Sequence, residues 1–408
     1  MGKMIVKNIG MLATPEGKMA RRGAEQGEIK VLHDAYEVIE EGVITAIGTG
    51  TPPAADGEVI DARGKLVTPG LVDAHTHLIF GGWRQNELGL KLHGATYLDI
   101  LAMGGGILST VNATRAATEQ ELTDKARAAL DEMLSMGVTT VEAKSGYGLD
   151  LENELKQLRA IRRLNEEHPV DLVSTFLGAH AVPKEYKEDR EAYIRLLCEK
   201  VIPAVAEEHL AEFCDVFCET GVFSAEESKV ILEAGKKYGL VPKIHADEID
   251  PIGGSQLTAE VGAISAEHLI VCPPAGIAAM AKAGTVACLL PATSFYLGST
   301  FAPARDMINA GVPVAMASDF NPGSCPSLNL QFVMNLGCLR YRPTPEEVLT
   351  AVTLNGAAAI NRADTVGSLE VGKQGDLVIW NSEDLNYICY RMGSNLVDTV
   401  VKNGQKII

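Results

Sequence analysis

The feature that most constrains the fold of this chain is a regular alternation of short apolar strands and amphipathic helices through residues 66–364. Runs rich in Val, Ile, Leu and Ala are typical of strands that are covered on both faces. The expected strands cover residues 72–78, 139–144, 172–178, 215–219, 242–245, 266–269, 286–290 and 312–319. Eight strand and helix units in about 290 residues predict an α/β fold of the TIM (β/α)8 barrel type.

The helical segments between these strands have start and stop signals of their own. They cover residues 121–136, 152–167, 190–208, 224–238, 254–261, 274–283, 304–310 and 345–360. Thr118 followed by Glu121 is a capping box, and Gly137, Gly239 and Gly311 stand where glycine commonly ends a helix.

An open, doubly wound parallel sheet is the alternative to a barrel. Such a sheet needs a glycine-rich phosphate loop after its first strand, where this chain has His75-Thr76-His77. The run Gly104-Gly105-Gly106 lacks the Lys and Ser or Thr of a phosphate loop, so we interpret it as a flexible connection. The pattern therefore favours the barrel.

Both ends of the chain have a different pattern, with short strands separated by Gly, Pro and Asp. Strands are expected at residues 4–9, 29–39, 42–48 and 58–61, and strands with turns again at 367–380 and 397–408. Neither end has enough apolar surface to fold alone, so residues 1–65 and 365–408 are expected to form one small β-sandwich domain beside the barrel. The polar residues 25–28, with Arg21 and Arg22 before them, are expected to form a solvated loop.

The net charge of −17 limits the partners that this protein can have. A surface of this sign repels nucleic acid and anionic membranes, so neither is expected to bind. No apolar run is long enough to span a bilayer and residues 1–10 lack the layout of a secretory signal, so a cytoplasmic protein is expected. The eight cysteines include no Cys-x-x-Cys pair and are expected to be reduced thiols.

Histidines collect at the carboxyl ends of the expected strands, where the active sites of such barrels lie. His75 and His77 end the first strand on one face, about 7 Å apart along it. His245 ends the fifth strand, His268 the sixth and Asp319 the eighth. The remaining histidines, apart from His180 after the third strand, are expected on the surface or in packing: His33, His93, His168 and His209.

Imidazole and carboxylate groups at these points suit one ion of zinc or iron. The expected ligands are His75, His77, His245 and Asp319. Such an ion lowers the pKa of bound water towards about 7, so hydrolysis is the natural chemistry. His268 is either a fifth ligand or a residue that orients the water or polarises a carbonyl. Glu248 suits a proton shuttle between this water and a substrate nitrogen.

A second metal ion is less expected. Barrel hydrolases with two ions commonly bridge them with a modified lysine at the end of the fourth strand, where this chain has Cys218-Glu219-Thr220. Lys144 ends the second strand instead, where it supports Glu142, contacts the substrate or forms a purely structural ion pair. The pattern therefore indicates a site with one ion.

With these residues in place, the chain resembles the amidohydrolase superfamily over nearly its whole length. The general part of the resemblance is the run of residues 67–77 together with the return of the chain through residues 367–379. The narrower part resembles the imidazolonepropionase family of histidine degradation. It consists of Phe80-Gly81-Gly82-Trp83-Arg84, Ser145-Gly146-Tyr147-Gly148-Leu149, residues 177–183, His245-Ala246-Asp247-Glu248 and residues 319–324.

This resemblance implies a reaction, a substrate and a set of site residues. Water would add to the amide bond of 4-imidazolone-5-propanoate, which opens the ring and gives N-formimidoyl-L-glutamate, and the protein would be a homodimer. The catalytic candidates are Glu248, His268 and Asp319, and the first proton acceptor is either Glu248 or the other two acting as a pair. The implied substrate-binding residues are Arg84, Tyr97, Tyr147, His180, Glu248, Asn321, Gly323 and Ser324.

Two other functions stay open. The spacing of His245 and Glu248 would serve equally well in an aminohydrolase that deaminates a nucleobase or another cyclic amidine. That enzyme would have no evident use for His180 or for Arg84, whose guanidinium offers two donors to the carboxylate tail of the propanoate. A non-catalytic scaffold descended from a metal hydrolase would be expected to have lost ligands that this chain retains.

Overall fold

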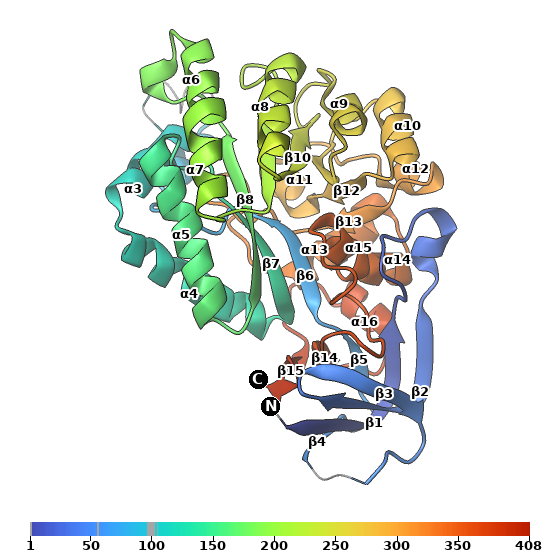
Figure 1. Cartoon of the computed structure of the whole chain (residues 1–408). Coiled ribbons are helices and arrows are strands. Elements are labelled where there is room, and N and C mark those ends of the chain that lie inside the picture. The colour runs from blue at the N-terminus through green and yellow to red at the C-terminus, as the bar shows by residue number, and fades with distance from the viewer. Residues whose placement is uncertain (1, 55–56, 96–102, 104) are drawn as a thin grey trace.

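Two sheets organise the computed structural model, which describes residues 2–54, 57–95, 103 and 105–408 (Figure 1). One is a parallel sheet of eight strands that curls into a barrel, and the other is a curled sheet built from both ends of the chain. Helices cover the outside of the barrel, and the end sheet lies below it in the view of Figure 1.

The barrel strands pair in chain order, each parallel to the next. They are β6 (Leu71–Thr76), β7 (Val138–Lys144), β8 (Asp171–Ala179), β9 (Phe213–Cys218), β10 (Val241–Ala246), β11 (Ser265–His268), β12 (Val286–Leu289) and β13 (Val314–Met316). The amide of Asp319 donates to the carbonyl of His75 at 3.0 Å, and that of His77 donates to the carbonyl of Phe320 at 2.9 Å. These bonds join the last strand to the first, which confirms the predicted barrel.

The outer helices include all eight helical segments that the sequence predicts, with several more between them. They are α3 (Ile107–Ala116), α4 (Glu119–Ser135), α5 (Leu151–Glu167), α6 (Arg190–Leu196), α7 (Ile202–Glu207), α8 (Ala225–Lys237), α9 (Gly254–Val261), α10 (Pro274–Ala283), α11 (Pro291–Leu297), α12 (Ala304–Asn309), α13 (Leu330–Leu336), α14 (Pro345–Ala351) and α15 (Leu354–Ala359). Thr118 and Glu121 form the predicted capping box of α4. Gly137, Gly239 and Gly311 have φ angles of +93°, +85° and +83°, as expected of glycines that end helices.

Several helical predictions need correction. The single helix expected at residues 190–208 contains a π-helical turn, Leu197–Val201, and the one expected at residues 345–360 is interrupted where Thr353 leaves helical geometry. Short helices were missed, including α1 (Glu87–Leu92), α3, α11, α13 and α16 (Leu385–Tyr390). Most have only six or seven residues, which is too short for a hydrophobic period to be recognised, and their stability comes from packing on the barrel.

The end sheet joins strands from the two ends of the chain. Its order is β16-β15-β14-β5-β1-β2-β3, with β4 paired to β1. The strands are β1 (Lys3–Thr14), β2 (Lys30–Glu40), β3 (Val43–Thr49), β4 (Glu58–Asp61), β5 (Leu66–Pro69), β14 (Leu377–Trp380), β15 (Val397–Lys402) and β16 (Gln405–Lys406). The buried indole of Trp380 donates to the hydroxyl of Thr68 at 2.9 Å, which ties the late strands to the early ones. The predicted sandwich of both ends is thus one continuous curled sheet, whereas its predicted limits at residues 65 and 365 stay a prediction.

The polar segment expected as a solvated loop is solvated only in part, because Arg22, Glu25 and Glu28 are exposed whereas one residue between them packs under the barrel. Gly23–Gly27 forms a 3-10 helix, and Gln26 is fully buried. The side chain of Gln26 donates to the carbonyl of Val314 and accepts from its amide, each at 3.1 Å. The polar composition of the segment did not predict the burial of Gln26, because this residue bonds to backbone groups of a strand nearly 290 residues away.

The state of the cysteines and the length of the helices agree with the expectations from the sequence. All eight cysteines are free, and six of them are buried, as expected of reduced thiols in a core. No helix in the described part of the chain is long and apolar enough to cross a membrane.

Candidate active site

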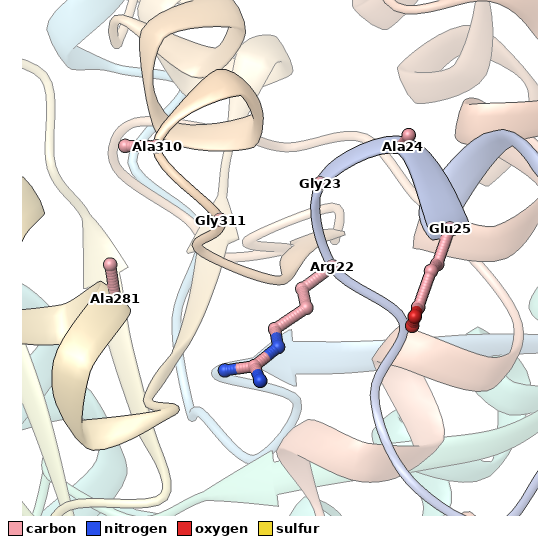
Figure 2. A pocket seen from close by; sticks show the side chains of 7 residues that line it. All are labelled: Arg22, Gly23, Ala24, Glu25, Ala281, Ala310 and Gly311. Carbon is pink, nitrogen blue, oxygen red and sulfur yellow. The ribbon is translucent and has the colours of Figure 1, made fainter.

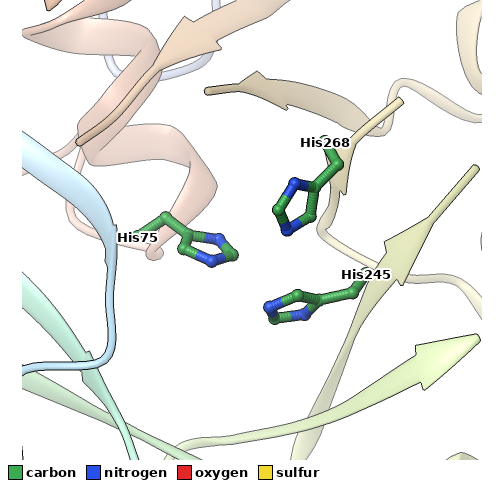
Figure 3. Close-up of side chains that lie close together, drawn as sticks. All are labelled: His75, His245 and His268. Atoms are coloured by element: carbon green, nitrogen blue, oxygen red, sulfur yellow. The ribbon is translucent and has the colours of Figure 1, made fainter. Parts of the chain in front are cut away.

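Four histidines and one aspartate converge at the carboxyl ends of the barrel strands. His75 and His77 come from the end of β6, His245 from β10, His268 from β11, and Asp319 from the loop after β13. The imidazoles of His75, His245 and His268 point toward one another (Figure 3). One nitrogen from each of these three lies within 4.8 Å of the others, and so do ligand atoms of His75, His77 and Asp319.

The spacing of these atoms fits a metal ion better than hydrogen bonding. Oδ1 of Asp319 lies 3.4 Å from Nε2 of His75 and 3.5 Å from Nε2 of His77. Ligands at about 2.1 Å from a tetrahedral ion are separated by about 3.4 Å. Among the described residues, no hydrogen-bond partner is found for buried Nε2 of His75, Nε2 of His245 or Oδ1 of Asp319. Buried ligand atoms without partners are costly unless an ion or water binds them, and His75 belongs to both groups of close ligand atoms, so these residues fit a divalent metal.

The remaining nitrogen or oxygen atoms of His75, His245 and Asp319 contact side chains that we did not predict as part of the site. Nδ1 of His75 contacts the carboxylate of Glu267, and Nδ1 of His245 lies 3.0 Å from Oδ2 of Asp215. Thr293 donates to the other carboxylate oxygen of Asp319 at 2.6 Å. A signal for two of them was present, since Asp215 and Glu267 are charged residues inside otherwise apolar strands.

The backbone is unusual where the strands end. His268, Asp319 and Asp247 have φ angles of +68°, +54° and +51°, in the left-handed region that residues with a Cβ rarely adopt. Such conformations cost about 1–3 kcal/mol each and persist where the surroundings impose them, commonly at active sites. The three residues thus turn sharply out of the barrel and bring the side chains of His268 and Asp319 to its mouth.

Glu248 lies on the loop after β10, beside the histidines. Its Oε2 atom is 3.7 Å from Nε2 of His268, and its side chain is 16% exposed. Burial raises the pKa of Glu248 to about 7, against the opposing effect of His245. A carboxyl group with a pKa near neutrality can both accept and return a proton, which suits the predicted shuttle.

The loop that carries Glu248 is fastened by another acidic residue. Glu219, at the end of β9, accepts hydrogen bonds from the backbone amides of Thr220, Ile249 and Asp250 at 2.7, 2.9 and 3.1 Å. Glu219 thus follows the fourth barrel strand, where a bridging lysine was considered for a two-metal site, and it holds the loop after β10 through hydrogen bonds.

His180 and Tyr147 form an aromatic wall next to His77. The rings of His77 and His180 are stacked, with their centroids 4.8 Å apart and an angle of 11° between the planes. Nδ1 of His180 lies 3.0 Å from the carbonyl oxygen of Gly146, so this nitrogen carries the hydrogen and Nε2 is the free acceptor. Burial, followed by the charge of His245, lowers the pKa of His180 to about 3. His180 is therefore neutral.

Arg84 and the loop after β13 lie against each other. The Arg84 side chain is only 12% exposed, and its Nε atom is 3.2 Å from Oε2 of Glu87. A Cβ atom on Gly323 would overlap the Arg84 guanidinium, so the glycine allows the close approach. Asn321 accepts from the amides of Gly323 and Ser324 at 2.8 and 2.7 Å, which means that its side chain shapes this loop.

The structure therefore brings together most of the predicted site residues. Tyr97 is the exception, because it lies outside the described residues. Lys144 is fully buried and pairs with Glu142 at 2.7 Å, which agrees both with support for Glu142 and with a purely structural ion pair. The four histidines assigned to surface or packing lie outside the group: His33, His93 and His209 are exposed, and the side chain of His168 is buried.

A surface cavity elsewhere on the molecule has no comparable chemistry (Figure 2). It is lined by Arg22, Gly23, Ala24, Glu25, Ala281, Ala310 and Gly311. Ala281 lies near the end of α10 and Gly311 precedes β13, so the cavity is at the amino ends of the strands, opposite the histidines. Residues on that face of a barrel serve stability more often than catalysis.

Comparisons with known proteins agree with this geometry. A family model described as the amidohydrolase family matches residues 66–407. The imidazolonepropionase of Alkaliphilus metalliredigens is 54% identical over 412 residues, covering 99% of this chain and 98% of that protein. The imidazolonepropionase of Bacillus cereus is 54% identical over 404 residues, covering 97% of this chain and 95% of that protein.

Solved structures of lower identity have the same fold. The atrazine chlorohydrolase of Arthrobacter aurescens, complexed with zinc, has a TM-score of 0.73 at 18% identity and covers 99% of this chain and 95% of its own. An adenosine deaminase from Xanthomonas campestris with bound zinc has a TM-score of 0.72 at 19% identity and covers 99% of this chain and 92% of its own. At this identity the likeness shows the fold alone.

Proposed function

The chain belongs to the amidohydrolase family, and we propose that it is a metal-dependent hydrolase that opens the ring of 4-imidazolone-5-propanoate to give N-formimidoyl-L-glutamate. The observation that carries this proposal is the convergence of ligand atoms of His75, His245 and His268, and of His75, His77 and Asp319, at the mouth of the barrel. Identity above 50% to imidazolonepropionases over nearly the whole chain supports the choice of substrate.

We assign the metal to His75, His77, His245 and Asp319, with His268 beside them. Nitrogen and oxygen ligands of this kind suit both zinc and iron, and we propose one of these. Such an ion, when bound, lowers the pKa of a water molecule towards about 7 and polarises an amide carbonyl. The residues around it must then position the substrate and move protons.

Glu248 is the residue placed to move the proton. Its pKa of about 7 lets the carboxylate accept a proton from the attacking water and return it to the ring nitrogen as the amide C–N bond breaks. His268, 3.7 Å away, is placed to orient the same water. The alternative first acceptor is the pair of His268 and Asp319.

The substrate is held by groups that match its two ends. Nε2 of neutral His180 offers an acceptor to a ring N–H, since Nδ1 is engaged with Gly146. The guanidinium of Arg84, on the loop facing Gly323, offers paired donors to the propanoate carboxylate. A nucleobase has no such anionic tail, so this arrangement favours the imidazolone over a deaminase substrate.

The test of the reaction compares two classes of substrate. The purified protein is given 4-imidazolone-5-propanoate, and N-formimidoyl-L-glutamate is measured by mass spectrometry, while ammonia release is measured with adenosine and guanine. We expect ring opening to dominate. Faster ammonia release from a nucleobase would indicate a deaminase, and no turnover by metal-loaded protein would indicate a non-catalytic scaffold.

Removal of the metal tests the role of the ion. Elemental analysis is expected to find about one equivalent of zinc or iron per chain, and dialysis against a chelator is expected to abolish ring opening. Activity should return when zinc or iron is added back. Full activity in a sample with no detectable metal would contradict metal-dependent hydrolysis.

We also propose that the protein acts in the cytoplasm as a homodimer. Its relatives with the highest identity named above are metabolic enzymes, which is consistent with this location. Light scattering coupled to size-exclusion chromatography measures the mass of the particle, and a mass of a single chain of 43.5 kDa would contradict the dimer.

A further inference from the structure

A group of five charged side chains lies inside the barrel, directly below the histidines. We call it the barrel charge cluster, and each of its members is fully buried: Glu142, Lys144, Asp215, Lys243 and Glu267. They come from four strands of the barrel: β7, which carries Glu142 and Lys144, and the three neighbouring strands β9, β10 and β11. Buried charges on this scale are costly unless they are paired, so their arrangement needs a reason.

The two lysines hold the three carboxylates in one chain of contacts. Nζ of Lys144 lies 2.7 Å from Oε1 of Glu142 and 2.9 Å from Oδ2 of Asp215. Nζ of Lys243 lies 3.2 Å from the same oxygen of Glu142 and 3.5 Å from Oε1 of Glu267. Each lysine therefore joins the central Glu142 to one outer carboxylate.

Each outer carboxylate also reaches a histidine of the candidate metal site. Oδ2 of Asp215, the oxygen that Lys144 contacts, lies 3.0 Å from Nδ1 of His245. Glu267 contacts Nδ1 of His75 through Oε2, while Lys243 and the hydroxyl of Ser265 contact its Oε1. In His75 and in His245 the carboxylate lies next to Nδ1, so Nε2 is the nitrogen that remains available to an ion.

We propose that Lys144 and Lys243 are positioning residues of the metal site. They hold Asp215 and Glu267 in place, and these carboxylates fix the imidazoles of His245 and His75 with Nε2 turned toward the ion. This inference rests on the proposed function, because it assumes that the histidines bind metal. Partners of this outer kind commonly change metal affinity by about 10–100-fold when they are removed.

A purely structural role for the lysines would have different consequences, and the chain contains a matched control. Lys402 in the end sheet is also buried, with its side chain 2% exposed, and it lies 2.6 Å from carboxylate oxygens of both Asp171 and Asp376. It contacts none of the histidines at the barrel mouth. Replacement of Lys144 or of Lys402 should lower the stability of the fold, but only the replacement of Lys144 should weaken metal binding.

The experiment compares Lys144→Met with Lys402→Met in the full-length protein. Zinc affinity is measured by competition with a chromophoric chelator, and melting temperatures are measured with and without zinc. We expect both variants to melt at lower temperature without zinc. Lys144→Met should bind zinc at least about tenfold more weakly, whereas Lys402→Met should bind it as the native protein does. Native zinc affinity in folded Lys144→Met would overturn the proposal.

A measurement on the native protein keeps the proposal testable if Lys144→Met does not fold. Histidine labelled with ¹⁵N reports which ring nitrogen carries hydrogen, and His75→Asn and His245→Asn assign the two signals. In the zinc-free protein we expect hydrogen on Nδ1 of both residues, and hydrogen on Nε2 would overturn the proposal. A native protein that binds neither zinc nor iron would overturn the proposed function together with this inference.

Discussion

The two nitrogens of each imidazole have separate tasks at the candidate site. Nδ1 of His75 and Nδ1 of His245 lie beside carboxylates, and the Nε2 atoms have no hydrogen-bond partner among the described residues. In His180 Nδ1 contacts the carbonyl of Gly146, so Nε2 is again the free atom. A histidine whose second nitrogen is held has one orientation, and this prepares the site before a ligand arrives.

Glu248→Gln tests the proton shuttle. The amide keeps the size of the side chain but cannot accept and return a proton, so turnover should fall by about 10² or more. The metal content should stay at its native value, because Glu248 is not among the proposed ligands. Asp250→Asn, an exposed carboxylate on the same loop, is the control and should retain native turnover. Native turnover in Glu248→Gln would remove this residue from the mechanism.

Arg84→Ala tests the binding of the propanoate. Loss of the guanidinium should raise the KM for 4-imidazolone-5-propanoate by about tenfold or more, with a smaller change in kcat, since the tail does not react. Gly323→Ala should act in the same direction, because its Cβ atom would push the guanidinium away. Steady-state kinetics measures both effects. An unchanged KM in Arg84→Ala would place the carboxylate elsewhere.

The elements contribute to the site mainly through the ends of strands and the loops that follow them. The loop after β10 is short and carries Glu248, yet its position depends on Glu219 of the preceding strand. The loop after β13 is folded by Asn321 and packs against Arg84 through Gly323. Neighbouring strands thus fasten the loops of one another.

Glu219→Ala tests this fastening. The amides of Ile249 and Asp250 would lose their acceptor, which should cost about 1–3 kcal/mol of folding stability. Turnover should fall because Glu248 loses its fixed position, while metal content should not change. Glu219→Gln keeps one acceptor oxygen and should have a smaller effect on both quantities. Native kcat in Glu219→Ala would show that the loop holds its position without this residue.

At the scale of the whole molecule, the two ends of the chain depend on each other. Strand β14 pairs with β5, and β15 extends the same sheet, so residues after 376 complete a surface begun by the first 69 residues. Within this sheet Glu37 lies opposite Val6 and Ile47, is fully buried, and has no hydrogen-bond partner for its carboxyl oxygens in the described part of the chain.

Glu37 predicts a dependence of stability on pH. Burial raises its pKa from 4.5 to about 8, so between these values the folded chain keeps a proton that the unfolded chain has lost. The free energy of unfolding should therefore fall as pH rises through this window, by up to about 5 kcal/mol, and level off above it. Thermal melts from about pH 6 to about pH 9 measure the effect.

The variants for this prediction lie on the same strand. Glu37→Gln is neutral at every pH and should lose this part of the decline, whereas Glu40→Gln removes an exposed carboxylate of β2 and should retain it. The same decline of melting temperature in Glu37→Gln as in the native protein would assign the pH dependence to other groups.

Local pattern was sufficient to predict much of this protein. The eight barrel strands, most of the long helices, and the helix boundaries at Thr118 and Gly137 were predicted correctly, because buried strands, capping boxes and terminal glycines have short-range signatures. Several helices of six or seven residues, such as α11 and α16, and the burial of Gln26 were not, since distant contacts stabilise them.

The sequence by itself also determined which groups reach the mouth of the barrel. Once the strands are known, the positions of His75, His245, His268 and Asp319 at their ends follow from the parallel order. Only the tertiary structure decided how these groups are held, through Asp215, Glu267 and the two buried lysines. The physical reason is that strand ends are set by local periodicity, whereas pairing between buried charges depends on which side chains of different strands face one another inside the closed barrel.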